Sequence, residues 1–191
     1  KQHIIPNFIS NEFTKINKNY KRQKIFIWSV KRDRGLKNMF DIWIKKIYPS
    51  NNDAKLFIFG VSPKLFKKDI NFYEKNNIYL FCLVQKKILK KFYNKSLAMI
   101  CLGYDETFCL NALEANACGL PIITFGYSAL RDFTFNNKNG YVVNNYDELA
   151  NKINDLCNSK INKDVINYSY DYSKKFDLDK VVNKWINLLK N

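Results

Sequence analysis

The sequence predicts a doubly wound parallel α/β domain, in which one parallel sheet carries helices on both faces. Short and almost wholly apolar runs, typical of strands that are buried on both sides, recur along the chain. Between them lie stretches whose apolar residues return every three or four positions, which is the period of an amphipathic helix. Hairpin signals are few, so consecutive strands are expected to be joined through helices and to run parallel.

The first predicted unit is a strand at 25–28 followed by a helix. One face of that helix carries apolar residues at helical spacing: Leu36, Phe40, Trp43 and Ile47. Pro49 is expected to end the helix, because proline cannot continue one. The later predicted strands are 56–60, 78–81, 97–102, 121–125 and a short sixth at 141–143.

Four further helices are predicted. One lies at about 86–94, and another at 110–118 has Gly119 as its C-cap with Pro121 beyond it. Two C-terminal helices are predicted from apolar residues that share a face: Leu149, Ile153 and Leu156 in one, and Val181, Trp185 and Leu188 in the other.

The 191 residues suit one domain. Residues 1–23 are polar and basic without sustained periodicity, so we interpret them as a linker and lead-in segment and residues 24–191 as the folded domain. The chain begins with Lys1 rather than methionine and shows no signal peptide. We therefore expect it to be part of a longer protein, with an N-terminal domain missing.

The composition narrows the classes of partner. The net charge is +15, which favours nucleic acid, an anionic membrane surface or an anionic small molecule, although a coding bias toward A and T would also enrich solvated lysine. No apolar run approaches the roughly 20 residues that span a bilayer. Five cysteines without a CxxC pair and a single histidine provide no basis for a zinc site of the usual spacing. Reduced thiols favour a cytoplasmic location.

Two loops at the expected carboxyl ends of strands carry polar residues suited to a ligand. The first, SVKRDRGL at 29–36, places Lys31, Arg32 and Arg34 before a glycine that opens a helix. These cations and the helix dipole would converge on an anion such as a diphosphate. A solvated basic turn is the alternative, and no Walker or GxGxxG pattern is present.

The second loop contains Glu106, just past a buried strand, and leads to Glu114, inside an otherwise apolar helix. A buried glutamate is costly without partners, and the vicinal hydroxyls of a ribose are suitable ones, because one carboxylate accepts from both. Between the two acids, the amides of Phe108, Cys109 and Leu110 would point at phosphate oxygens. These groups together describe a nucleotide-sugar site. The alternative is a capped helix whose glutamate pairs with a nearby lysine.

The segment around the two glutamates, ETFCLNALEANACGLPIIT, resembles the E-x7-E signature of retaining nucleotide-sugar glycosyltransferases, glycosyltransferase family 4. Other segments are similar to the family in the same order. HIIPNFIS resembles its V-x-P-N-G-I segment before the hinge, SVKRDRGL its basic R/K-G-L loop, and KLFIFG and IYLFCLV its second strand and its base-holding strand. SALRDF and NNKNGYVV resemble its late G-G-x-x-E and G-x-L-V stretches. The resemblance spans nearly the whole chain, and the block at 106–121 is its specific part.

The resemblance implies an enzyme of the GT-B fold, with two Rossmann-like domains, of which this chain is the C-terminal, donor-binding half. Such an enzyme transfers a sugar from a nucleoside-diphosphate sugar to an acceptor hydroxyl with retention, and no metal or other cofactor is expected. The acceptor, a glycan or a membrane-surface molecule, would bind the missing N-terminal domain, so the protein could sit peripherally at a membrane. This chain alone is expected to bind the donor and to transfer little or nothing.

The resemblance also assigns roles to residues. Glu106 would be catalytic, in contact with the transferred sugar. Among the donor-binding residues, Arg34 would contact the diphosphate, with Arg32 or Lys31 assisting. The phosphates and the sugar would be held by Thr107, Phe108, Cys109 and Leu110. Leu83 and Val84 would face the base, and Glu114 would bind the ribose.

The chain departs from the family pattern at Ser29, where arginine is frequent, at Cys82 and Cys109, where glycine is usual, and at Asp132, where glutamate is usual. The base and the sugar of the donor are therefore not specified by the sequence. Two other functions are weighed. A basic nucleic-acid-binding α/β domain is disfavoured because most aromatic residues fall in predicted strands and helices. A non-catalytic nucleotide-sugar-binding relic is disfavoured because both glutamates are present.

Overall fold

The computed structural model describes residues 5–14, 21–29, 35–62, 70–104, 106–159 and 162–190. In this part of the chain one six-stranded parallel sheet has the order β3-β2-β1-β4-β5-β6. The strands are β1 (Ile25–Trp28), β2 (Lys55–Phe59), β3 (Ile78–Phe81), β4 (Ala98–Cys101), β5 (Ile122–Thr124) and β6 (Gly140–Val142). The order reverses between β1 and β4, as in a doubly wound sheet, so the predicted fold class is confirmed.

The central strands β1 and β4 are buried at every residue. Phe26 of β1 packs against the ring of Trp43, with 6.0 Å between centroids. Phe57 of β2, whose register partner is Ile27, contacts Phe92 at 5.4 Å. Neighbouring positions of a strand point to opposite faces, so Trp43 and Phe92 lie on opposite sides of the sheet. Helices on both faces explain why these strands are apolar throughout.

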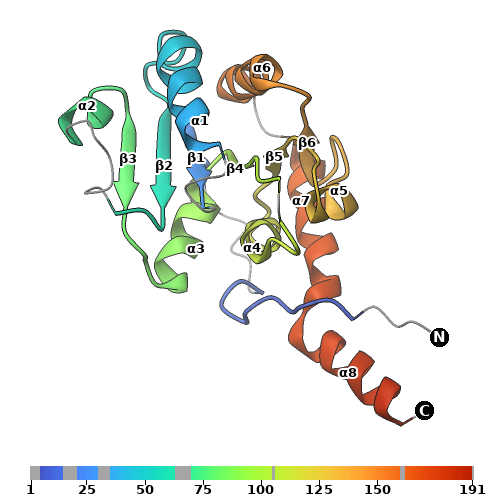
Figure 1. Ribbon diagram of the computed structural model, residues 1–191. Helices are drawn as coiled ribbons and strands as arrows, with labels where there is room; N and C mark the ends of the chain where they lie inside the picture. Colours follow the sequence, from blue (N-terminus) through green and yellow to red (C-terminus); the bar gives the residue numbers. More distant parts are fainter. Residues whose placement is uncertain are drawn as a thin grey trace.

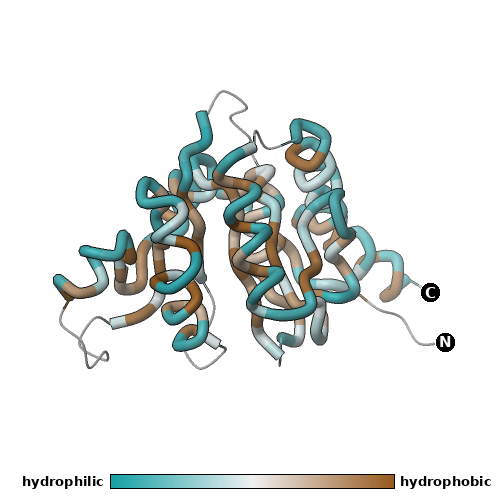
Figure 2. Tube along the Cα trace, turned by 90° about the horizontal axis from the view of Figure 1, so that it is seen from above, coloured by the Kyte–Doolittle hydropathy of each residue, from teal (hydrophilic) through white to brown (hydrophobic). Residues whose placement is uncertain are grey.

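The helices are α1 (Leu36–Ile42) with a π-helical continuation (Trp43–Ile47), α2 (Ile70–Glu74), α3 (Lys86–Lys95), α4 (Leu110–Ala117), α5 (Ala129–Phe133), α6 (Tyr146–Asn158), α7 (Lys163–Ser173) with a 3₁₀ turn (Lys174–Phe176), and α8 (Leu178–Leu189). The first of them packs beside α6, and α4 packs against α7 (Figure 1). Hydrophobic and hydrophilic residues alternate along the helices, as expected of helices with one face on a core (Figure 2). No described helix is long and apolar enough to cross a membrane.

Three helices were not predicted, and each lacks the expected apolar pattern. The helices α2 and α5 have only five residues each, too few to establish a period. In α7 the buried positions are Val165, Ser169 and Ser173, so serine stands where the pattern requires an apolar residue. Ser169 and Ser173 donate their hydroxyls to backbone carbonyls of their own helix, those of Val165 and Tyr170, which allows them to be buried.

The described part of the predicted lead-in segment packs on the domain. Ile9 and Phe13 are fully buried, and the amide of Ile9 donates to the carbonyl of Phe176 at 2.8 Å. The ring of Phe13 lies 5.8 Å from that of Tyr93 in α3. In Figure 1 this segment crosses beneath the carboxyl ends of the strands, toward α8. The polar composition of this segment gave no sign that Ile9 and Phe13 belong to the core. That the segment leads in from a missing domain stays a prediction.

Arg22, near the end of the N-terminal segment, forms hydrogen bonds with two helix ends. Its guanidinium donates to the carbonyls of Tyr93 and Ser96 at 3.1 and 2.6 Å, at the end of α3. It also donates to the carbonyls of Cys118 and Gly119 at 3.0 and 2.8 Å, just after α4. Burial lowers the pKa of Arg22 to about 10, so the group stays charged at neutral pH. A cation at two helix C-termini is favourable, because their free carbonyls carry partial negative charge.

Candidate functional site

The candidate site lies along the carboxyl edge of the sheet, where the strand order reverses and doubly wound domains bind ligands. Ser29 follows β1 at this edge. Asn111, in the first turn of α4, donates its side-chain amide to the carbonyl of Ser29 at 2.5 Å. The end of β1 and the start of α4 are thus held together.

Residues 30–34 of the basic loop predicted to hold a diphosphate fall outside the described residues, and with them Lys31, Arg32 and Arg34. Gly35, which follows them, is described and stands before α1 in a left-handed conformation, with φ +94°. A Cβ at this position would lie 2.9 Å from the hydroxyl of Tyr146. The positive φ favours glycine here, and any larger residue would also have to displace the Tyr146 hydroxyl.

Glu106 follows β4 and is partly exposed at the edge of the sheet. Its carbonyl accepts from the amide of Ala129 at 3.1 Å. The hydroxyl of Ser128 donates to the carbonyl of Tyr104, and the rings of Tyr104 and Tyr127 stack with centroids 4.8 Å apart. These contacts join the loops after β4 and β5, so Glu106 sits on a braced loop.

The helix α4 begins without a side-chain cap. Its N-cap residue, Cys109, is left-handed with φ +49° and ψ +63°, which is costly for a residue other than glycine. The predicted alternative of a capped helix is therefore wrong in that respect. Leu110 begins the helix and is 38% exposed, Phe108 is half-buried, and Thr107 is exposed. The first amides of a helix have no intrahelical acceptor, so this end offers donors to a ligand.

Glu114 is buried within α4, with 2% of its side chain exposed. Its Oε1 lies 2.6 Å from Nζ of Lys86, the first residue of α3. Burial raises the pKa of Glu114, and the lysine acts in the opposite direction. The predicted pairing with a nearby lysine is confirmed, and the binding of a ribose stays a prediction.

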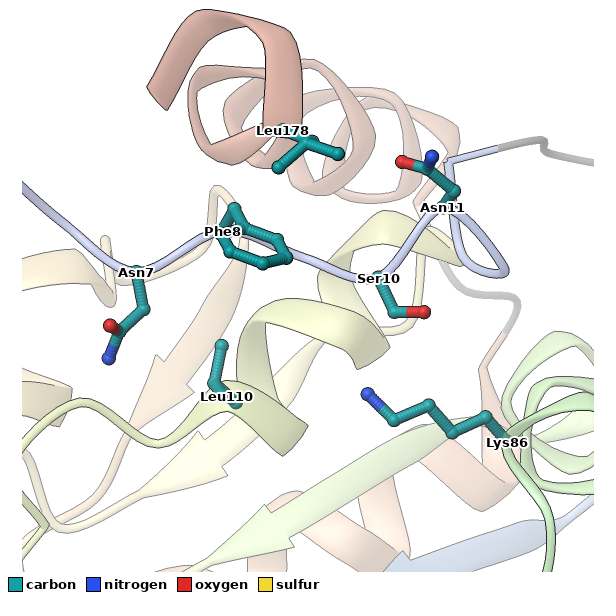
Figure 3. A pocket seen from close by; sticks show the side chains of 7 residues that line it. All are labelled: Asn7, Phe8, Ser10, Asn11, Lys86, Leu110 and Leu178. Carbon is teal, nitrogen blue, oxygen red and sulfur yellow. The ribbon is translucent and has the colours of Figure 1, made fainter. Parts of the chain in front are cut away.

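A cavity of about 550 Å³ opens beside this ion pair. Its volume is within the range of small-molecule sites. Its wall is formed by the N-terminal segment and by three helices: Asn7, Phe8, Ser10, Asn11, Lys86, Leu110 and Leu178. In Figure 3, Lys86 extends into the cavity toward Leu110 and Ser10. Sequence reasoning missed Lys86 and the N-terminal wall, and the one available signal was a lysine at the start of a helix.

The residues predicted to face a base follow β3. Leu83 is 90% exposed and Val84 is half-buried against the core. Gln85 occupies the N-cap position of α3 in an extended conformation, without a side-chain cap, and Lys86 follows as the first residue of the helix. The structure therefore arranges the segments after β3 and β4 along one edge, joined by the contact between Lys86 and Glu114. Among the described residues no group of three metal-ligating side chains occurs.

Comparisons with known proteins agree on one family. The model of the family "Glycosyl transferases group 1" matches residues 10–172. An uncharacterized glycosyltransferase of Methanocaldococcus jannaschii is 30% identical over 148 residues, which are 74% of this chain and 41% of that protein.

Many solved structures are similar in fold, and two of them serve as examples. A point mutant of TarM of S. aureus, in complex with fondaparinux, α-GlcNAc-glycerol and UDP, has a TM-score of 0.80 at 20% identity, over 99% of this chain and 39% of TarM. The C-terminal domain of a glycosyl transferase group 1 family protein, LpcC of Francisella tularensis, has a TM-score of 0.61 at 19% identity. That match covers 90% of this chain and 96% of that domain. The chain spans about two fifths of the archaeal protein and of TarM.

Proposed function

Because this chain belongs to the glycosyl transferases group 1 family, we propose that it is the nucleotide-sugar-binding domain of a GT-B glycosyltransferase. The whole protein would transfer a sugar from a nucleoside-diphosphate sugar to an acceptor hydroxyl. The observation that carries this proposal is the position of Glu106, the open start of α4 and buried Glu114 along one edge, at the reversal of strand order. These groups suit a sugar, a diphosphate and a ribose in turn.

In the proposed mechanism the domain stabilises the leaving group. The nucleoside diphosphate departs toward the amides from Thr107 to Leu110 and toward the basic loop at 31–34, while the sugar, beside Glu106, is attacked by the acceptor hydroxyl. Donors arranged in advance around a developing negative charge lower the barrier without a metal ion, so we propose that none is needed. Retention and membership of the E-x7-E class, family 4, belong to this proposal.

Uridine is the first base to test, because TarM was solved with UDP. We further propose that Leu83 and Val84 face the base. We also propose a cytoplasmic location, because all five cysteines are free thiols. Donor binding without appreciable transfer is expected of this chain, since it spans only about two fifths of the archaeal glycosyltransferase and of TarM.

The test is a panel of UDP, GDP, ADP and their sugar conjugates, measured by thermal shift and calorimetry on the 191-residue chain. A ligand that binds the folded state raises the melting temperature by mass action. We expect one base to be selected, and Glu114→Gln to weaken its binding by about tenfold or more, because a neutral amide oxygen is a weaker acceptor than a charged carboxylate and the NH₂ group does not accept.

Asp155→Asn is the matched control. It removes an exposed carboxylate on α6, where the nearest cation is Lys152 at 3.8 Å, and should leave nucleotide binding unchanged. A flat panel, with tight and salt-sensitive binding of single-stranded RNA, would overturn the proposal and favour the nucleic-acid-binding alternative.

A further inference from the structure

We propose that Lys86 is a positioning residue for the donor, which keeps Glu114 as an ionised acceptor beside the cavity. This inference rests on the proposed function, because the ligand that Glu114 would receive is the ribose of the nucleotide. Lys86 and Glu114 are 28 residues apart and belong to different helices, α3 and α4. Their contact, 2.6 Å between Nζ and Oε1, is one that folding creates.

The need for such a residue follows from the burial of Glu114. Only 2% of its side chain is exposed, and removing a carboxylate from water favours its protonated form. A protonated carboxyl carries its own donor hydrogen and cannot accept equally from both hydroxyls of a ribose. The site therefore works only if something opposes the effect of burial, and a cation in direct contact does so.

Among the residues that the structure describes, Lys86 is the cation that contacts Glu114. Lys90, one turn further along α3, donates to the carbonyl of Glu12 at 2.6 Å. Arg22, near the end of α4, donates to four backbone carbonyls. The other neighbours, Tyr93 and Cys118, are neutral at physiological pH. Burial raises the pKa of Tyr93 well above its ordinary value and that of Cys118 to about 12.

Lys86 is also well placed to act on a ligand site. It is the first residue of α3, directly after the segment that contains Leu83 and Val84. Its ammonium lies 5.8 Å from the centre of the ring of Phe13, which is fully buried, while 54% of the Lys86 side chain is exposed. Figure 3 shows the Lys86 side chain extending into the cavity. One side chain thus links the proposed base segment, the buried carboxylate and the cavity.

The test measures UDP affinity by calorimetry from about pH 6 to about pH 9, for the 191-residue chain and for Lys86→Met. Without the lysine the pKa of Glu114 rises further, so the Glu114 carboxyl is protonated in a growing fraction of the molecules as the pH falls. Affinity scales with the competent fraction, so the variant-to-wild-type ratio of Kd should grow by up to about tenfold per pH unit below the new pKa. Taking this ratio cancels the titration of UDP itself.

Three variants make the result specific. Lys87→Met removes an exposed neighbouring charge from the same helix end and should behave as wild type at every pH. Lys86→Arg keeps a cation, so its ratio of Kd to that of the wild type should be independent of pH. Glu114→Gln cannot titrate at residue 114, and its affinity should stay low across the range.

Two results would overturn the proposal for Lys86 without affecting the proposed function. One is wild-type affinity in Lys86→Met, and the other is a loss in that variant that is equal at all pH values. Either result would leave the proposed function standing if Glu114→Gln still weakens UDP binding. Failure of the wild-type chain to bind UDP or any other nucleotide in the panel would overturn both proposals.

Discussion

Two helices of this domain, α4 and α6, follow opposite designs at their first turns. Asn145 caps α6 by accepting from the amides of Asp147 and Glu148 at 3.0 and 2.9 Å. Two acidic residues then occupy its first turn, where the helix dipole favours them. In α4 the N-cap Cys109 is left-handed, makes no side-chain cap, and is followed by a first turn without acidic residues.

The two helices also differ at their C-termini. After α6, the hydroxyl of Ser159 donates to the carbonyl of Asp155 at 2.7 Å, so the helix satisfies its own end. After α4, Gly119 is left-handed with φ +64°, and two carbonyls receive the guanidinium of Arg22, from a distant part of the sequence.

This difference separates stability from function. The helix α6 obeys the local rules at both ends and forms a support. An uncapped start without acidic residues, as in α4, is unfavourable for folding but keeps amides and positive potential available for an anion. Violations of local rules are expected to cluster at functional sites.

The largest effect is expected from Arg22, whose loss would show how far α4 depends on distant residues. Arg22→Met should lower the free energy of unfolding by about 3 kcal/mol, because buried carbonyls at two helix ends lose their donors. Chemical denaturation measures the change. Ser159→Ala, which removes the local bond at the end of α6, is the matched control and should cost less than about 1 kcal/mol. Equal losses in the two variants would contradict the comparison.

A smaller effect is expected at the start of α6. Asn145→Ala should lower the free energy of unfolding by about 1 kcal/mol, the usual effect of losing an N-cap. It should leave UDP affinity unchanged, because α6 serves as a support. Thermal unfolding and calorimetry on the same variant separate these two quantities. A loss of UDP affinity with little loss of stability would place α6 in the site and remove the distinction from α4.

Much of the fold could be predicted from the sequence, because buried parallel strands are apolar runs. The first and third strands match the predicted 25–28 and 78–81, and α4 ends one residue before the predicted 118. Gly119 marks that end because its left-handed conformation follows from local chain geometry. The helix α7 was missed because Ser169 and Ser173 occupy its buried face.

The candidate site was predictable only in part. The spacing of Glu106 and Glu114 lies within one loop and helix, so the sequence displays it directly. The partner of Glu114 does not appear in any local pattern, because Lys86 is one of several lysines in α3 and only packing selects it. Phe13 and Arg22 were hidden for the same reason, since both act through tertiary contacts.

The smallest expected effect compares the two glutamates by pH. Burial raises the pKa of Glu114 in α4, so between its unfolded and folded pKa values the folded protein retains a proton that the unfolded chain has released. Its contribution to stability therefore falls as the pH rises through this window, and is constant above it. The amide and side chain of Asn144 donate to Glu148 in α6 and lower its pKa. The stability from Glu148 is complete above the unfolded pKa and is lost as the pH falls through the folded one.

The measurement is the free energy of unfolding of wild type, Glu114→Gln and Glu148→Gln from about pH 3 to about pH 8. We expect the wild-type advantage over Glu114→Gln to decrease with rising pH, and the advantage over Glu148→Gln to increase. Because the slopes have opposite signs, an error common to both variants cannot produce the result. Slopes of the same sign would mean that the fold stabilises the ionised form of Glu114 as it does that of Glu148. The burial of the carboxylate in α4 would then not lower the stability of the protein.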